Sequence, residues 1–360
     1  DTDMNHQHAA LPLLDFALAP FAEFMADDTV EDIIMNRPNE VFVRRGATTT
    51  RHEVAVDFVD QQGIAILAAA IKGQNVGKAT PLLSCDLPGG TRLQAVLPPC
   101  VNDGTVALAI RRAKKTSPTL DQLAAGGIFS GVEPLRDGLS RDAEALVVLY
   151  HEACRATGPD ERHRAWTAFL RATMKARMTH VLCGEVGSGK TFFGMGLANE
   201  IPLDDRLVTV QDSDEWSALP HRNRTDLFYS KGGQGAANVT PNDLVEASLR
   251  LAMRWLLLQE LRGAEAFSFL RARRSGHPGL TTCHASSTRE VFPTLALMVK
   301  QAPAASSVEL TDIEASLKSL IDVVVHFHRP EGRFAVSEVW FRHAEAVRSE
   351  EHTSELQSLV

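Results

Sequence analysis

Alternation of apolar and polar positions divides the chain into regions with different predicted structure. Short apolar stretches at residues 30–35, 41–43, 93–97 and 106–110 are separated by turn residues, which predicts strands. Residues 61–72 repeat apolar positions at helical spacing and stop at Gly73, which predicts a helix. We therefore expect a mixed α+β amino-terminal domain over residues 1–112.

The following residues, 113–140, have the composition of a linker. They contain Lys114-Lys115, Pro118, Gly126-Gly127 and Pro134, which favour turns and loops over regular elements. From residue 141 onward, amphipathic helices lead into short buried strands at 179–183, 207–210 and 256–258. Strands that alternate with helices predict an α/β domain, and we place it at residues 141–347.

The last residues, 348–360, differ from the rest of the chain. They resemble the translation of a common sequencing adapter, and their polar composition offers no apolar face to bury. We expect this tail to be non-native and leave it out of the fold prediction.

Composition narrows the class of protein. The net charge of −8 argues against wholesale coating of nucleic acid, although a local basic patch is compatible with it. The longest apolar run, residues 64–71, is too short to cross a bilayer. None of the five cysteines forms a C-x-x-C pair, which favours free thiols in a reducing compartment. We expect a cytoplasmic protein whose membrane contact, if any, is peripheral.

The most specific motif is a complete phosphate-binding loop, or P-loop. It has the pattern Gly, four residues, Gly-Lys-Ser/Thr, and consists of Gly184, Glu185, Val186, Gly187, Ser188, Gly189, Lys190 and Thr191. The glycines let backbone N–H groups approach the phosphates, Lys190 carries its charge to the β- and γ-phosphates, and the Thr191 hydroxyl ligates Mg²⁺. A predicted strand precedes the loop and a predicted helix follows it, as phosphate binding requires. The sequence predicts binding of a nucleoside triphosphate with Mg²⁺.

Polar residues also follow three other predicted strands. Asp212 comes after residues 207–210, Glu260 comes after 256–258, and the segment 276–285 contains His277 and His284. In an open parallel sheet, ligands bind beyond the carboxyl ends of the strands. Acids placed there can hold Mg²⁺ or polarise the attacking water. Taken singly, each segment is equally compatible with a solvated strand end.

Taken together, these segments resemble one family. In order and spacing the chain is similar to the hexameric ATPases of type IV secretion and conjugal transfer, within the type II/IV secretion NTPase superfamily. The resemblance covers roughly residues 20–345 and rests on the following stretches: Asn36-Arg37-Pro38, Asp86-Leu87-Pro88-Gly89-Gly90, Arg92-Leu93-Gln94, Val96-Leu97-Pro98-Pro99, residues 227–235, Val239-Thr240-Pro241 and residues 261–266.

The resemblance implies a fold and a set of site residues. The fold is a RecA-like P-loop ATPase domain with a smaller α+β amino-terminal domain. Lys190 and Thr191 keep the roles given above, Glu260 polarises the water, and Asp212 belongs to an acidic box. The implied metal ligands are Thr191, Asp212 and Glu260. A histidine box and arginines of the amino-terminal domain that reach the phosphates complete the implied site: His277, His284, Arg92, Arg111 and Arg112.

The resemblance also implies partners. Members form homo-oligomeric rings, here a hexamer, at the cytoplasmic side of the inner membrane. They act with inner-membrane channel subunits on a transported protein or nucleoprotein, in export or in pilus assembly. The chain is therefore expected to be a motor that hydrolyses ATP.

Departures from the family pattern keep alternatives open. Gln211 stands where a glutamate usually precedes the acidic-box aspartate, Gln259 replaces a glycine before Glu260, and His277 and His284 are one residue closer than usual. Because an amide takes no proton, we expect slow turnover that Gln211→Glu would speed. The alternatives are a catalytically weak ATP-binding ring subunit, which Gln211 favours, and a nucleic-acid translocase, which would need a basic stripe bearing aromatic residues.

Overall fold

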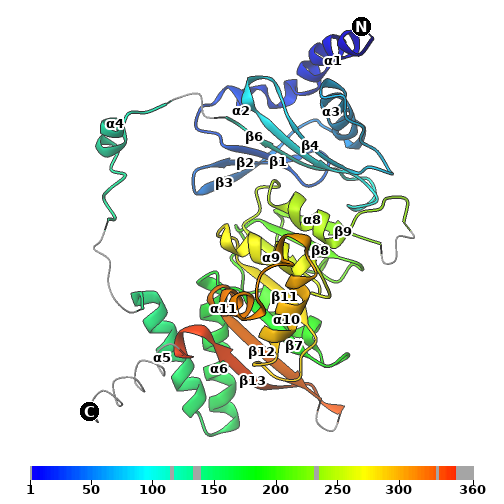
Figure 1. Ribbon diagram of the computed structural model, residues 1–360. Coiled ribbons are helices and arrows are strands. Elements are labelled where there is room, and N and C mark those ends of the chain that lie inside the picture. Colours follow the sequence, from blue (N-terminus) through cyan, green and yellow to red (C-terminus); the bar gives the residue numbers. More distant parts are fainter. Residues whose placement is uncertain (1, 114–116, 133–138, 231–234, 330–331, 346–360) are drawn as a thin grey trace.

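The computed structural model describes residues 2–113, 117–132, 139–230, 235–329 and 332–345. Within these ranges two sheets form, one above the other in Figure 1, and a long connecting segment joins them at the side. The tail 348–360, expected to be non-native, lies outside the described residues.

The amino-terminal sheet has six strands in the order β3-β2-β1-β6-β5-β4, and every neighbouring pair is antiparallel. Its strands are β1 (Asp32–Met35), β2 (Glu40–Arg45), β3 (Thr48–Glu53), β4 (Leu82–Asp86), β5 (Arg92–Val96) and β6 (Ala107–Arg111). The sequence analysis did not predict β3. Its residues are mostly exposed and polar, so that no apolar face marked it as a strand.

Helices α1 (Thr2–Ala17) and α3 (Phe58–Ile71) pack side by side on this sheet, and the short helix α2 (Ala22–Ala26) follows α1 (Figure 1). Helix α3 begins three residues before the predicted range. The Asp57 carboxylate accepts a hydrogen bond from the Asp60 N–H, and the Asp60 carboxylate accepts one from the Asp57 N–H, which forms a capping box. The buried core beneath the helices includes Phe21, Ile33 and Ile64.

The second sheet has seven strands in the order β13-β12-β7-β11-β10-β8-β9. All neighbouring pairs are parallel except β12 with β13. The strands are β7 (His180–Gly184), β8 (Leu207–Gln211), β9 (Arg224–Phe228), β10 (Trp255–Leu258), β11 (Gly279–Cys283), β12 (Val323–His328) and β13 (Ala335–Phe341). The carboxyl ends of six strands therefore meet at one edge of the sheet.

Helices cover both faces of this sheet, as an α/β fold requires. Residues alternate along the strands between two buried clusters: Val208 and Leu256 belong to one cluster, whereas Leu207 and Leu257 belong to the other. The first cluster lies under α8 (Pro241–Ser248), α9 (Glu265–Arg274), α10 (Val291–Lys300) and α11 (Leu310–Leu320). The second lies under α5 (Arg141–Arg155), α6 (Pro159–Lys175) and α7 (Lys190–Ala198).

The two sheets meet through a buried polar junction. Arg206, which is 5% exposed, precedes β8 and donates to the Leu251 carbonyl (2.7 Å), to Asn36 Oδ1 (2.6 Å), to Asn223 Oδ1 (2.7 Å) and to Thr225 Oγ1 (3.0 Å). Asn36 belongs to the amino-terminal sheet region and the other partners to the second. Burial lowers the pKa of Arg206 to about 9. The junction therefore satisfies a buried guanidinium with oxygens contributed from both sides.

The segment between the sheets contains an element that the sequence analysis did not predict. Helix α4 (Leu120–Ala125) begins at a capping box formed by Thr119 and Gln122, which overrides the linker composition around it. Figure 1 shows α4 standing apart from both sheets. Its Leu120 and the following Ile128, Phe129 and Val132 are between 54% and 71% exposed.

Candidate active site

The P-loop joins the carboxyl end of β7 to the first turn of α7. Gly184, Gly187 and Gly189 have φ values of 142°, 73° and 89°, a region that other residues rarely adopt. A Cβ on Gly184 would lie 2.4 Å from the Phe327 carbonyl oxygen of the neighbouring strand β12. Position 184 therefore requires glycine because of its backbone conformation and the nearby β12 carbonyl, independently of any ligand.

Lys190 begins α7, and its side chain lies back along the loop. Its Nζ donates to the carbonyl oxygens of Gly184 (2.8 Å) and Glu185 (2.7 Å). The residue is 8% exposed, and burial lowers the pKa of its ammonium, although Glu260 acts in the opposite direction. The hydroxyl of Ser188 is buried and has no hydrogen-bond partner among the described residues. A buried unpaired donor inside a ring of backbone amides fits a phosphate ligand.

Glu260 and His284 meet beside this loop. Glu260 follows β10 and His284 follows β11, so both lie at the same sheet edge as the P-loop. His284 Nε2 lies 2.7 Å from Glu260 Oε1, and His284 Nδ1 lies 3.1 Å from the Gly184 carbonyl oxygen. The imidazole therefore connects the carboxylate to the first residue of the P-loop.

Arg262 is a site residue that the sequence analysis missed. Its Nε donates to Glu260 Oε2 (2.7 Å), and its Nη1 lies 3.1 Å from Asp212 Oδ2. The hydrogen bond to Glu260 raises the pKa of the guanidinium. Arg262 thus holds together the carboxylates that follow β8 and β10. The signal was its position two residues after Glu260 at a strand end.

Gln211 does not fit the role expected of it. The residue is fully buried, its Nε2 donates to Thr209 Oγ1 (3.2 Å), and its Oε1 accepts from the Glu215 N–H (2.9 Å). Gln259 similarly accepts from the Asp212 N–H (2.8 Å) and donates to Ser213 Oγ (3.2 Å). Both amides order the loop that carries Asp212, because their polar groups are engaged within it.

His277 lies far from His284. It precedes β11 whereas His284 follows it, so the two are on the order of 20 Å apart along an extended strand. Burial lowers the pKa of His277, and Arg254 and Arg111 lower it further by charge repulsion. The structure therefore does not bring His277 to the P-loop edge.

The arginines expected to reach the phosphates are held elsewhere in this chain. Arg111 Nε lies 2.8 Å from Asp32 Oδ1, and Arg112 Nη2 lies 3.3 Å from Asp28 Oδ1. Arg92 is paired with Arg111 across β5 and β6. The charge of Arg111 lowers the pKa of His277, so Arg111 lies near the amino edge of the second sheet, where His277 precedes β11. Neither Arg111 nor Arg112 comes to the P-loop of its own chain.

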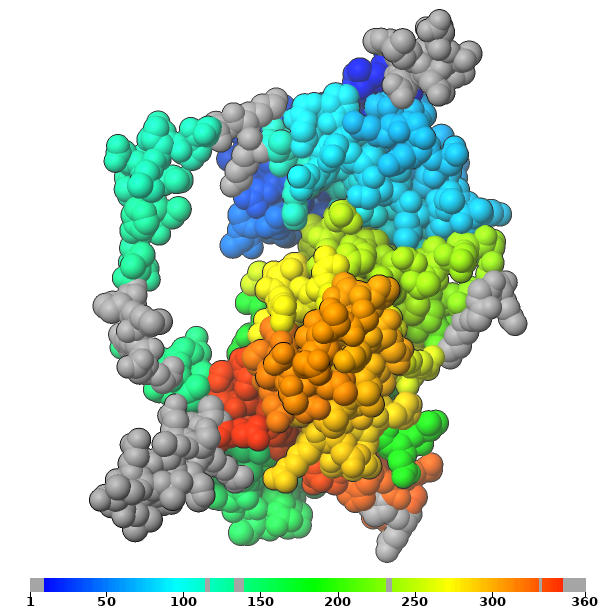
Figure 2. Space-filling view, in the orientation of Figure 1, coloured from blue at the N-terminus to red at the C-terminus, as the bar shows by residue number. Residues whose placement is uncertain are grey.

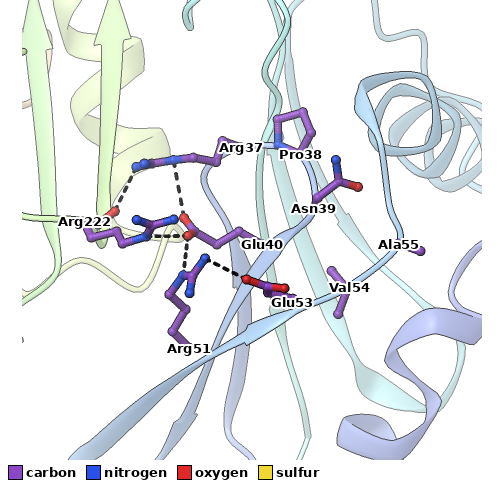
Figure 3. Close-up of a pocket in the computed structure, with 9 residues that line it drawn as sticks. All are labelled: Arg37, Pro38, Asn39, Glu40, Arg51, Glu53, Val54, Ala55 and Arg222. Atoms are coloured by element: carbon purple, nitrogen blue, oxygen red, sulfur yellow. Dashed lines mark hydrogen bonds and ion pairs between the residues drawn. The ribbon is translucent and has the colours of Figure 1, made fainter.

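A cavity of about 600 Å³ lies at the junction between the two domains (Figure 3). Glu40, whose side chain is 3% exposed, lies 2.5 Å from Arg51, 2.6 Å from Arg222 and 3.4 Å from Arg37. Burial alone would raise the pKa of Glu40, but hydrogen bonds from Arg51 and Arg222 leave it lowered. Since Arg222 belongs to the second domain, Glu40 ties the domains together. The arginines in this cavity are committed to Glu40.

The residues expected to hold Mg²⁺ lie around the P-loop edge. Thr191 is in the first turn of α7, and Asp212 and Glu260 share Arg262. No group of three or more His, Cys, Asp or Glu side chains that could hold a metal ion occurs in the described ranges. Mg²⁺ is commonly bound by one or two carboxylates together with substrate phosphates and waters. A hydroxyl and two carboxylates beside a phosphate loop fit that mode.

Comparisons with known proteins show the family to which the chain is similar. A family model described as type II/IV secretion system protein matches residues 155–347. The type IV secretion system protein VirB11 of Bartonella henselae is 35% identical over 331 residues, which are 90% of this chain and 91% of that protein. The protein VirB11 of Agrobacterium tumefaciens is 36% identical over 333 residues, covering 91% of this chain and 94% of its own.

A solved structure of a relative has a similar fold. The crystal structure of the VirB11 ATPase from the Brucella suis type IV secretion system, in complex with sulphate, superposes with a TM-score of 0.83 at 32% sequence identity. The match covers 92% of this chain and 99% of the other. The predicted fold class, an α/β RecA-like ATPase domain with a smaller α+β domain, is confirmed.

Proposed function

The chain belongs to the type II/IV secretion system protein family, and from that premise we propose that it is a Mg²⁺-dependent ATPase motor of a bacterial type IV secretion or conjugal-transfer system. The observation that carries this proposal is the convergence of the P-loop, Glu260 and His284 at one sheet edge. His284 contacts both Gly184 and Glu260, so the phosphate-binding element and the carboxylate form one site.

In this site each residue has a distinct task in phosphoryl transfer to water. The amides of the P-loop and the Lys190 ammonium bind the β- and γ-phosphates, for which Lys190 must leave the carbonyls that it now contacts. Thr191, with Asp212 and Glu260 nearby, would hold Mg²⁺, which would supply positive charge to neutralise the phosphates. Glu260 orients the attacking water, and His284 and Arg262 hold that carboxylate in place.

We further propose that Arg111 and Arg112 act on the P-loop of a neighbouring subunit in a homo-oligomeric ring, because they lie away from the P-loop of their own chain. The position of Arg111 near His277 supports this, because His277 precedes β11 at the amino edge of the second sheet, away from the P-loop. The exposed apolar residues Leu120, Phe129 and Val132 of the linker also support assembly, since a neighbour would cover them. A head-to-tail contact of this kind closes into a ring, and six subunits is the expected number.

The proposed setting is the cytoplasmic side of the inner membrane. None of the helices in the described ranges is long and apolar enough to cross a membrane. We propose peripheral contact there with secretion-channel subunits, and a transported protein or nucleoprotein as the final substrate. Family membership supports this setting.

A subunit-mixing experiment tests catalysis and ring geometry together. The Lys190→Ala variant has intact arginines but an inactive P-loop, whereas the Arg111→Gln/Arg112→Gln variant has the reverse. Each variant alone should hydrolyse little ATP in the presence of Mg²⁺. Equal mixing with subunit exchange should restore activity at about a quarter of the sites, since half of the intact loops then meet an intact neighbour.

Two results would contradict the proposal in different ways. Full activity of the arginine double variant would show that these arginines do not reach the phosphates of any subunit. Absence of recovery, in rings shown by mass to contain both variants, would contradict their action on a neighbour. Absence of ATPase activity in the wild-type protein would contradict the proposal that the chain is an enzyme.

A further inference from the structure

Beside the P-loop, on the side away from Glu260, lies an exposed aromatic ring that the phosphate chemistry does not use. Phe334 is 58% exposed and lies against Gly189: a Cβ on Gly189 would be 2.9 Å from two atoms of the Phe334 ring. Figure 2 shows orange residues of the carboxyl-terminal part of the chain close to green residues of the same domain at the lower right. An exposed aromatic ring beside the P-loop can stack on a planar group of a bound ligand.

Arg329 also lies close to this ring. Its guanidinium carbon lies 5.3 Å from the centre of the Phe334 ring, within the range of cation–π attraction. Its Nε also donates to the Gly332 carbonyl at 3.2 Å, which fixes the arginine next to the ring. The pair is therefore ordered before any ligand arrives.

The sheet order gives the direction in which a nucleotide must lie. Strand β7, which leads into the P-loop, lies between β11 and β12. On the β11 side are His284 and Glu260, which must face the γ-phosphate, where water attacks. The ribose and base therefore extend to the other side, over the end of β12, where Phe334 and Arg329 lie.

We propose that Phe334, supported by Arg329, is the stacking platform for the purine base of the bound nucleoside triphosphate; this inference rests on the proposed ATPase function. Stacking on an aromatic ring or a guanidinium plane tolerates every base, since each has a π face. The platform should therefore bind ATP and GTP with similar affinity. It should contribute nothing to the binding of inorganic tripolyphosphate, which has no base.

Calorimetric titration of the full chain with ATP, GTP and tripolyphosphate, each with Mg²⁺, tests this platform. Phe334→Ala should lower the affinity for ATP and for GTP by about tenfold, within the range of base–aromatic stacking. The affinity for tripolyphosphate should not change. Phe334→Trp should restore nucleotide binding, and Arg329→Gln should weaken both nucleotides by a smaller factor. The matched control is Phe16→Ala, which removes a ring that is 82% exposed on α1.

The three ligands separate failure of this inference from failure of the proposed function. Equal weakening of ATP and tripolyphosphate in Phe334→Ala would show that the ring only shapes the P-loop and would overturn the platform. Unchanged binding of all three would also overturn it. Both of these results leave ATP binding by the wild-type protein intact, so they overturn the platform alone. Wild-type protein that does not bind ATP would overturn the proposed ATPase and the platform with it, whether or not it binds tripolyphosphate.

Discussion

The two edges of the parallel sheet both carry many polar residues, yet they differ in exposure. At the carboxyl edge, the side chains of Arg262 and His284 are each 46% exposed beside the P-loop. At the amino edge, Arg206 and His180 are 5% and 0% exposed, and their hydrogen bonds are made within the protein. The comparison teaches that clustered polar residues mark a site only where solvent and ligand can reach them.

The same comparison separates two kinds of charge arrangement. Arg206 is surrounded by neutral oxygens of Asn36, Asn223 and Thr225, an arrangement that fixes the domain junction. Arg262 instead bridges the carboxylates of Asp212 and Glu260, which could bind a metal cation in its place. The first arrangement is expected to govern stability and the second turnover.

Lys190→Ala tests the carboxyl edge with the largest expected effect. Removing its charge should lower ATP turnover by about 10²-fold or more, because no neighbouring cation replaces it at the phosphates. Steady-state ATPase assays check this, with the exposed Lys175→Ala as the matched control. Undiminished turnover in Lys190→Ala would sink the mechanism.

Glu260→Gln should reduce turnover by about 10²-fold while nucleotide affinity stays near that of wild type. The amide keeps the size of the side chain but loses the charge that orients water and pairs with His284. Single-turnover hydrolysis and equilibrium binding measured on the same samples separate the two effects, with the exposed Glu309→Gln as control. A tolerated Glu260→Gln would remove this residue from the catalytic role.

Arg206→Met probes the amino edge, where the effect should be on stability. Several buried oxygens would lose their donor, and we expect a loss of about 3 kcal/mol in unfolding free energy. Urea denaturation measures this, with the exposed Arg250→Met as control. If turnover per folded molecule also fell by 10²-fold, the amino edge would be functional and the comparison would be wrong.

Stability should fall between pH 7 and pH 5 in a manner that depends on His180. Burial lowers the pKa of His180 from 6.5 to about 4, so the unfolded chain binds a proton in this range that the folded chain does not. Stability is therefore retained above pH 6.5 and lost as the pH falls, by about 2 kcal/mol at pH 5. Denaturation at both pH values should show a smaller loss in His180→Gln than in wild type or in the exposed His163→Gln.

Gln211→Glu should have the smallest effect, which revises the expectation from the sequence. Turnover should change by less than about threefold, or about 0.6 kcal/mol in activation free energy, because the side chain faces Thr209 and the Glu215 N–H. A parallel measurement of kcat for this variant and wild type decides the matter. A clear rise in kcat would return position 211 to the catalytic acidic box.

Local sequence signals predicted the elements that place the site. The P-loop glycines, the buried strands before Gly184 and Glu260, and the stop at Gly73 all act within a few residues. The helix α4 and the strand β3 were missed because their residues lack a clear apolar face. Arg262 was missed because its role depends on Asp212, fifty positions away in the chain.

The sequence by itself determined that this chain has a P-loop, an α/β sheet to carry it, and acids at the ends of neighbouring strands. These features are short motifs and periodic patterns, whose physical requirements are local. Only the tertiary structure decided which of the polar residues meet. Strand order joined His284 to Glu260, the extended strand β11 placed His277 at the opposite edge of the sheet, and burial turned Gln211 inward. Contacts between distant segments depend on the pairing of strands and the direction of side chains, which no local pattern specifies.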